Sequence, residues 1–182
     1  MKSLYLDSSI PSAYYEKAQF DRLEITQKWW EKNIHYYKVF TSELAQEEIE
    51  ALKQEKKREL ILSLISNFPK LKITDNIRKV AREYVEENII SAQDFNDALH
   101  LATASIYGIQ IFLSWDFAHI VNREVERKLR AFNLISGFPC IHITTPAKSI
   151  KESSPSCECL LRQTSFDEEL SWKEMTKNKN LL

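Results

Sequence analysis

Short apolar segments alternate with longer helical segments along this chain, and that order restricts the folds it can adopt. The apolar stretch Ser3–Leu6 precedes a helical pattern that runs from Asp21 to about Asn33, and the same order then recurs along the chain. Strands that are separated by a helix pair in parallel, because the crossover helix returns the chain to the same end of the sheet. The sequence therefore predicts an α/β fold with a mostly parallel central sheet flanked by helices on both faces.

Periodicity and capping residues place the individual elements. The predicted strands are Ser3–Leu6, Tyr36–Thr41, Leu71–Ile73, Ile109–Leu113 and Cys140–Thr144. The predicted helices are Asp21–Asn33, Leu44–Gln54, Lys56–Asn67, Asp75–Glu87, a segment that contains Asp97 and ends at Gly108, and Asn122–Leu134. Ser42 and Thr74 are suited to cap the helices that follow them, and Pro11 suits a first helical turn.

Composition narrows the function. The chain has 182 residues, of which 43% are hydrophobic and 28% charged, so it can form one domain with a substantial core. Only two glycines are present, which excludes Gly-rich phosphate-binding loops. The net charge of −1 provides no global basic field for nucleic acid. Three cysteines make no disulfide framework, and without a long apolar run we expect a cytoplasmic protein with no membrane segment.

The composition changes after Pro146. We therefore assign residues 1–146 to one folded domain and 147–182 to a C-terminal extension, which is either a partner-binding segment or a partly disordered end. Within it, Ser153–Ser156 resembles a linker and Phe166–Met175 could form one amphipathic helix. Cys157 and Cys159 lack a second Cys or His pair nearby, so we expect no zinc site there.

Four carboxylates are the candidate functional residues. Asp7 and Asp116 each follow a predicted strand, and Glu48 and Asp97 lie on the apolar faces of predicted helices. Ligands of parallel α/β sheets bind beyond the carboxyl ends of the strands, where Asp7 and Asp116 should lie. Taken singly, each aspartate is equally well explained as a turn former. Four converging acids would repel one another, so together they imply a hard divalent cation, Mg²⁺ or Mn²⁺.

The helical wheel selects Glu48 among its neighbours. Glu48 falls within the apolar arc of Leu44, Ala45 and Ile49, whereas the other glutamates of this helix point toward water. The alternative is a glutamate at the edge of the core that pairs with a basic group. Further along, we expect Asp94 to cap its helix, Asp97 to belong to the site, and His100 to be a structural or surface residue that points partly outward.

Other residues offer weaker indications. The basic runs Lys53–Arg58 and Arg123–Arg130 are interpreted as solvated helix faces, although they are the obvious candidates for contacts to a phosphate backbone. Trp115 could stack on a base, but core packing explains it better.

Four sequence motifs together resemble the PIN domain, and in particular the VapC-type toxin ribonucleases of prokaryotes. They are Leu4–Ser9, Tyr37–Ser42 continuing to Glu48, Asp97–Ala104 and Leu113–Phe117, and the resemblance covers about Met1 to Pro146. It implies a parallel sheet flanked by helices and a Mg²⁺- or Mn²⁺-dependent nuclease, in many members acting on RNA.

The resemblance also assigns residues. The family's first aspartate maps to Asp7, its glutamate to Glu48, the aspartate before the Ala-rich helix to Asp97 and the last acid to Asp116. Relatives often carry Asn at the last position with a His shortly after it, which His119 matches, so Asp116 is expected to be less essential. A cognate antitoxin and a homodimer are further implications of the resemblance.

Three functional hypotheses follow. The first is a metal-dependent endoribonuclease in which Asp7, Glu48, Asp97 and Asp116 hold Mg²⁺ or Mn²⁺. The second is a catalytically inactive PIN-like module that binds RNA or a protein. The third, a phosphatase with Asp7 as nucleophile, ranks lowest, because that class needs an aspartate where this chain has Ser9.

Overall fold

A computed structural model describes residues 1–152 of the chain. Five strands form one sheet in the order β3-β2-β1-β4-β5, and every neighbouring pair is parallel. The strands are β1 (Lys2–Leu6), β2 (Tyr37–Ser42), β3 (Lys70–Leu71), β4 (Ile111–Leu113) and β5 (His142–Thr144). The predicted parallel α/β architecture is confirmed.

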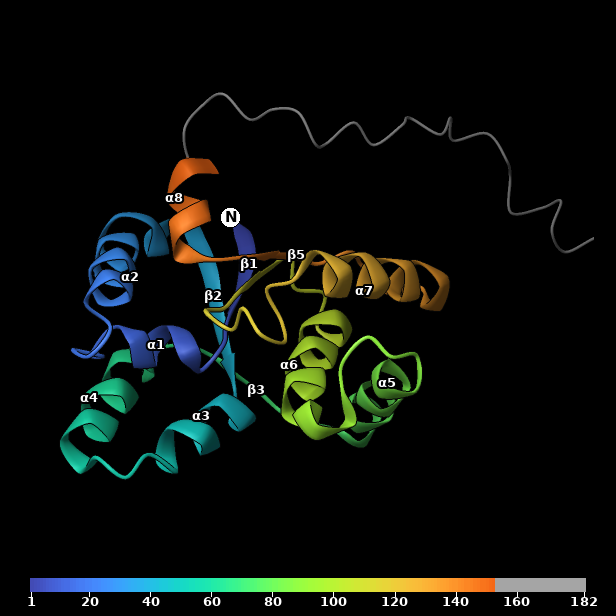
Figure 1. The fold of residues 1–182 in the computed structure, drawn as a ribbon, viewed down its shortest axis with the longest axis horizontal. Helices are drawn as coiled ribbons and strands as arrows, with labels where there is room; N and C mark the ends of the chain where they lie inside the picture. The colour runs from blue at the N-terminus through green and yellow to red at the C-terminus, as the bar shows by residue number, and fades with distance from the viewer. Residues whose placement is uncertain (153–182) are drawn as a thin grey trace, which may run out of the picture. The chain divides into compact units, whose positions relative to one another are not determined.

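Helices cover both faces of this sheet (Figure 1). They are α1 (Ser9–Ala13), α2 (Phe20–Asn33), α3 (Glu43–Glu50), α4 (Glu55–Ile65), α5 (Asp75–Glu86), α6 (Phe95–Ile106), α7 (Arg123–Ser136) and α8 (Pro146–Glu152). Short 3-10 turns at Ile34–Tyr36 and Ala92–Asp94 precede β2 and α6. Helices α1, α2 and α8 lie on one side of the sheet, and α5, α6 and α7 lie on the other.

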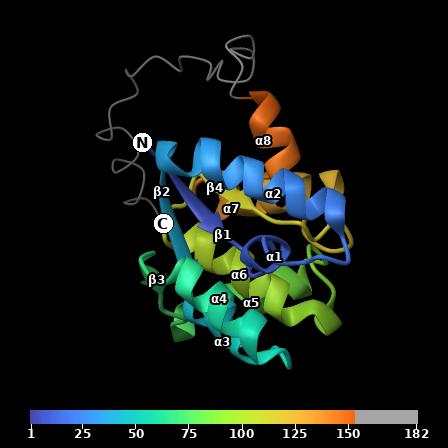
Figure 2. The same ribbon diagram turned by 90° about the vertical axis from the view of Figure 1, so that its left-hand side faces the viewer.

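Alternation along β1 divides the core between these two layers. Leu4 and Leu6 pack with Trp29 of α2, whereas Tyr5 points to the opposite face and packs in the cluster formed by α5, α6 and α7. Successive side chains of a strand face opposite sides, so a fully buried strand needs apolar residues at every position. A smaller cluster of Ile49, Ile61 and Ile65 joins α3 to α4, which lie together at the end away from α8 (Figure 2).

Several local predictions are confirmed. The Ser42 and Thr74 hydroxyls accept hydrogen bonds from Ala45 N and Ile77 N and cap α3 and α5. Gly108 follows the end of α6 with a φ of 66°, a left-handed conformation that glycine adopts without strain.

Other local predictions need correction. Helix α3 ends at Glu50 rather than near Gln54, because Leu52–Gln54 form a loop before α4. The chain also continues past Pro146 into α8, whose Ser149 accepts a hydrogen bond of 3.2 Å from the Trp29 indole. The compact unit of the structure is Met1–Lys151. The predicted linker at Ser153–Ser156, the cysteines at 157 and 159 and the predicted helix Phe166–Met175 lie outside the described residues.

Candidate metal centre

Asp7 follows the last residue of β1 and lies beside the carboxyl end of β4. Its backbone N–H donates to Leu113 O at 3.2 Å, and its side chain is buried. The hydroxyls of Ser9 and Ser114 each donate to Asp7 Oδ2 at 2.6 Å. Because β1 and β4 are parallel neighbours, their carboxyl ends meet at one edge, and the serines that follow them fix the orientation of this carboxylate.

Glu48 faces the same edge from α3. Its Oε2 accepts hydrogen bonds from Ser8 Oγ at 2.6 Å and from His100 Nε2 at 3.2 Å, and Asn96 Nδ2 donates to Oε1 at 3.3 Å. Burial by itself raises the pKa of Glu48, but the hydrogen bonds and the charge of His100 hold it below the usual value. The helical wheel therefore predicted the direction of this side chain correctly.

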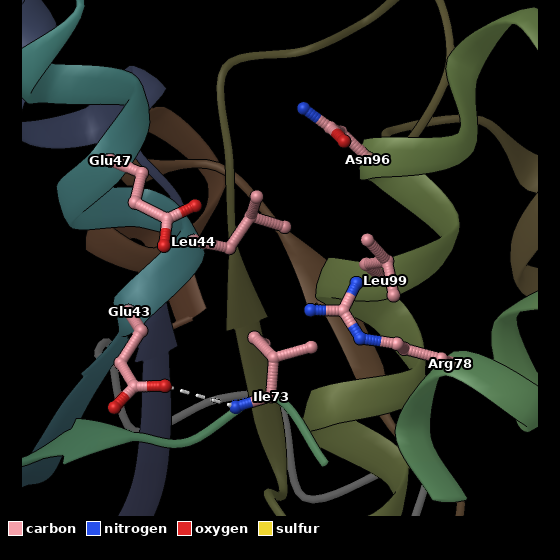
Figure 3. Close-up of a pocket in the computed structure, with 7 residues that line it drawn as sticks. All are labelled: Glu43, Leu44, Glu47, Ile73, Arg78, Asn96 and Leu99. Carbon is pink, nitrogen blue, oxygen red and sulfur yellow. Dashed lines mark hydrogen bonds between the residues drawn. The ribbon is translucent and has the colours of Figure 1, made fainter. Parts of the chain in front are cut away.

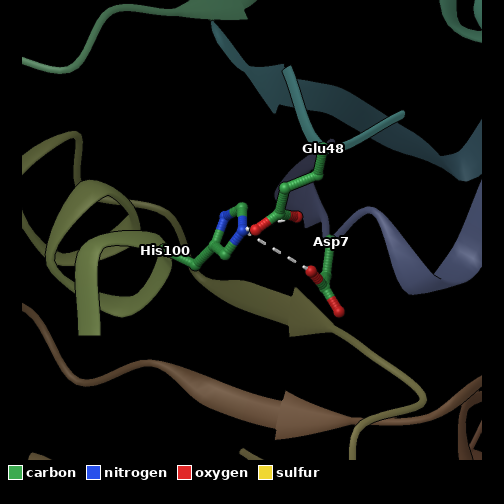
Figure 4. Close-up of side chains that lie close together, drawn as sticks. All are labelled: Asp7, Glu48 and His100. Atoms are coloured by element: carbon green, nitrogen blue, oxygen red, sulfur yellow. Dashed lines mark hydrogen bonds and ion pairs between the residues drawn. The ribbon is translucent and has the colours of Figure 1, made fainter. Parts of the chain in front are cut away.

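His100 differs from the prediction, since it is buried and does not point outward. Its Nδ1 lies 2.6 Å from Tyr5 Oη, and its Nε2 lies 3.2 Å from Glu48 Oε2 and 3.9 Å from Asp7 Oδ1 (Figure 4). Burial lowers the pKa of His100, but the hydrogen bond to Glu48 and the nearby acids raise it above its usual value. The structural role that we expected is thus found in the centre of the site.

Asp97 and Asp116 form a second group around His119. The Nδ1 atom of His119 lies 3.1 Å from Asp116 Oδ2 and 3.5 Å from Asp97 Oδ2. Burial, followed by the charges of Asp116 and Asp7, raises the pKa of Asp97 to about 6. Asp116 Oδ1 also accepts the backbone N–H groups of Ala118 and His119 at 2.9 Å each, so its turn-forming role is present as well.

Asp94 does not cap α6 with its side chain. It occupies the N-cap position without a side-chain hydrogen bond there, and its Oδ1 lies 3.8 Å from His119 Nε2. Asp94 thus lies in one group with Asp97 and His119, which the sequence pattern did not reveal.

These geometries fit a hard cation. Asp7 and Glu48 lie with His100 in one group of possible ligand atoms, and Asp94 and Asp97 lie with His119 in another, each within 4.8 Å. Burial raises the pKa of Asp97, and the like charges of Asp116 and Asp7 raise it further. A divalent cation would relieve this repulsion, and a donor set dominated by carboxylate oxygens suits Mg²⁺ or Mn²⁺.

Sequence reasoning missed Ser8, Asn96 and Ser114, which donate hydrogen bonds to Glu48 or Asp7, and Tyr5, which contacts His100. A signal existed for Tyr5, because strand alternation turns it away from Leu4 and Leu6 and toward the face that carries α6. A second signal was the spacing of His100, one helical turn after Asp97 and hence on the same face.

A groove of about 270 Å³ opens beside Glu48, between α3 and α6 (Figure 3). Its lining residues are Glu43, Leu44, Glu47, Ile73, Arg78, Asn96 and Leu99. Asn96 links the groove to the candidate metal site, since it lines the groove and its amide also donates to Glu48. The Arg78 guanidinium extends toward the groove from α5.

The predicted basic runs are partly engaged in intramolecular contacts. Lys57 pairs with Glu16, and Lys128 lies 3.0 Å from Glu124 Oε1. Trp115 is buried, and its indole donates to Thr26 Oγ1 at 2.8 Å, in agreement with a packing role.

Comparison with known proteins identifies the family. The model of the PIN domain matches residues 4–122, more than half of the chain, and this range contains all four predicted acids. The chain belongs to the PIN domain family. No curated protein is similar enough in sequence to match it.

Solved structures were also compared, and the first of them, VapC20, shares the fold. The toxin VapC20 of Mycobacterium tuberculosis, described as cleaving the sarcin-ricin loop, has a TM-score of 0.50 and 17% identity, over 77% of this chain and 99% of VapC20. VapBC-5 of M. tuberculosis has a TM-score of 0.47 and 15% identity, over 80% of this chain and 99% of that one. VapBC2 of Rickettsia felis, bound to a promoter DNA fragment, has a TM-score of 0.44 and 13% identity, over 78% and 97%.

Proposed function

We propose that this PIN-domain protein is a Mg²⁺- or Mn²⁺-dependent endoribonuclease that hydrolyses RNA phosphodiester bonds. The convergence of acids at the carboxyl edge of the sheet carries this proposal: Asp7 and Glu48 lie in one group of possible ligand atoms, and Asp94 and Asp97 in another, each within 4.8 Å. The raised pKa of Asp97, due to burial and to the charges of Asp116 and Asp7, agrees with this crowding. Buried like charges cost stability, so a chain that retains them is expected to use them.

In this proposal Asp7, Glu48, Asp97 and Asp116 hold the cation. A bound divalent cation supplies Lewis-acid activation of water and of the phosphodiester. The protein's own groups orient the ligands: Ser9 and Ser114 donate to Asp7, while Ser8 and His100 donate to Glu48. His119, 44% exposed, lies between Asp97 and Asp116 and would have to yield when a cation enters.

A toxin role with a cognate antitoxin is the second part of the proposal. Its support is the sequence resemblance to VapC-type toxins, together with the fold shared with VapC20. Co-expression with a neighbouring antitoxin gene should relieve growth arrest caused by this protein, and light scattering would report whether it forms a homodimer.

We place the protein in the cytoplasm. Within residues 1–152 no helix has the length and apolar character needed to span a bilayer.

The decisive test is the Asp7→Asn variant. We expect millimolar Mn²⁺ to raise the melting temperature of the wild type but not of Asp7→Asn, because the variant loses a carboxylate ligand while its amide still fits the pocket. RNA cleavage should fall by at least about 100-fold, in line with the loss of a group on which the chemistry depends.

Glu31→Gln is the control, since it removes one exposed acid from the end of α2 that leads into the start of β2, opposite the carboxyl edge of the sheet. It should retain both the Mn²⁺ shift and the cleavage. Cleavage at the wild-type rate by pure Asp7→Asn would refute the assignment. RNA binding without cleavage or a Mn²⁺ shift in the wild type would instead favour an inactive binding module.

A further inference from the structure

A buried chain of hydrogen bonds joins the three elements that carry Asp7, Glu48 and Asp97. Ser42 Oγ lies 2.6 Å from Tyr5 Oη, and Tyr5 Oη lies 2.6 Å from His100 Nδ1. His100 Nε2 then lies 3.2 Å from Glu48 Oε2. We call Ser42, Tyr5 and His100 the Tyr5 chain; all three are at most 1% exposed.

The hydrogens of this chain can be assigned along its whole length. Ser42 Oγ accepts from Ala45 N at 3.1 Å, so its own hydrogen is available to Tyr5 Oη. Tyr5 then donates to His100 Nδ1, which leaves Nε2–H to donate to the Glu48 carboxylate. If His100 carries a second proton, the Tyr5 hydroxyl reverses and donates to Ser42, while Nε2–H still donates to Glu48.

Each member of the Tyr5 chain is a near neighbour in the sequence of one of the acids. Tyr5 precedes Asp7 by two residues at the end of β1, and His100 follows Asp97 by one turn of α6. Ser42 caps α3, the helix that carries Glu48. The chain therefore starts at Ser42, where β2 meets α3, passes through β1 and α6, and ends at Glu48 on α3. It thereby fixes β1, α3 and α6 relative to one another.

We propose that the Tyr5 chain positions the acids for the cation, with Tyr5 and His100 as positioning residues rather than ligands. The inference rests on the proposed metal site. Buried polar groups that lose a partner are costly, so this arrangement strongly disfavours any displacement of β1, α3 or α6. Hydrogen-bonding partners that orient the ligands of a metal contribute strongly to its affinity.

Tyr5→Phe tests the proposal because it removes one hydroxyl and retains the ring, which stacks on Phe112. The chain offers a matched control in Tyr84, which is also fully buried. Tyr84 Oη lies 2.7 Å from Ser105 Oγ and 2.8 Å from Asn133 Oδ1, so Tyr84→Phe also removes a buried hydroxyl with two partners.

The experiment measures Mn²⁺ affinity by electron paramagnetic resonance of free Mn²⁺ and stability by urea unfolding, in the full-length proteins. We expect both variants to lose stability. Only Tyr5→Phe should raise the Mn²⁺ dissociation constant, by roughly 10-fold or more. Electron spin echo measurements on His119→Gln, which lacks the other imidazole near the acids, should show no directly coordinated nitrogen.

The outcomes separate this inference from the proposed function. If the wild type binds Mn²⁺, Asp7→Asn does not, and Tyr5→Phe binds as tightly as the wild type, only the positioning role is refuted. Equal weakening by Tyr84→Phe, or a nitrogen ligand on Mn²⁺ in His119→Gln, would refute it as well. A wild type that binds no Mn²⁺ would refute the metal site and the positioning role together.

Discussion

The carboxylate of Asp97 has the largest pKa shift among the acids of the site. Burial raises its pKa first, and the charges of Asp116 and Asp7 raise it further, to about 6 from 3.8. Asp97 is thus more easily protonated in the folded protein than in the unfolded chain. A raised carboxyl pKa means that ionisation destabilises the metal-free protein as the pH rises from about 4 to about 6.

Asp97→Asn should therefore stabilise the metal-free protein. With EDTA present at pH 7.5, we expect the free energy of unfolding to increase by about 1 to 2 kcal/mol, a value reduced from the full linkage figure because the side chain is partly exposed. The gain should disappear as the pH falls below about 4, where Asp97 is protonated in both states. Urea unfolding across this pH range measures it.

Glu31→Gln provides the control, because Glu31 is exposed on α2 and its replacement also removes one negative charge. It should show no comparable pH-dependent gain. A loss of stability in Asp97→Asn at pH 7.5 without metal would contradict the electrostatic argument for the site.

At the scale of elements, α3 and α5 begin in the same way and differ in what their caps touch. Ser42 accepts from Ala45 N and also contacts Tyr5, whereas Thr74 accepts from Ile77 N and is exposed. The first cap is thus part of the site, and the second is a local feature of one helix.

Replacing each cap by alanine should separate the two roles. Thr74→Ala should lower the free energy of unfolding by up to about 1 kcal/mol, the usual effect of losing a cap, and leave Mn²⁺ binding unchanged. Ser42→Ala should lower it by roughly 2 kcal/mol or more, because Tyr5 also loses a buried partner, and should weaken Mn²⁺ binding. Parallel urea and Mn²⁺ titrations test this, and equal effects of both variants on Mn²⁺ would contradict it.

The sequence pattern was enough to predict which way side chains point from their own helix or strand. It was not enough to predict their contacts with residues far away in the sequence. The wheel placed Glu48 toward the sheet, and the strand ends placed Asp7 and Asp116 near one edge, because periodicity alone determines those directions. The ring of His100 could not be placed, since its burial depends on Tyr5, which is 95 residues away in the sequence.

For the whole molecule, the parallel sheet could be derived from the order of elements, whereas the domain end at Pro146 stays a prediction. The change of composition at Pro146 suggested an end, whereas α8 packs Ala147 and Ile150 against the Trp29 cluster. A helix of this length has too little periodicity to predict, and its stability comes from tertiary packing.

Two shortened chains should locate the boundary. A chain that ends at Glu152 keeps the compact unit Met1–Lys151 and all four acids, so we expect cooperative unfolding and wild-type Mn²⁺ affinity. A chain that ends at Pro146 loses the hydrogen bond from Trp29 to Ser149 and the packing of Ile150, and should lose roughly 2 to 4 kcal/mol of stability. Urea unfolding of both chains measures the difference. Equal stability would return the boundary to Pro146, whereas a further loss in the longer chain relative to the full protein would show that residues beyond 152 contribute to the fold.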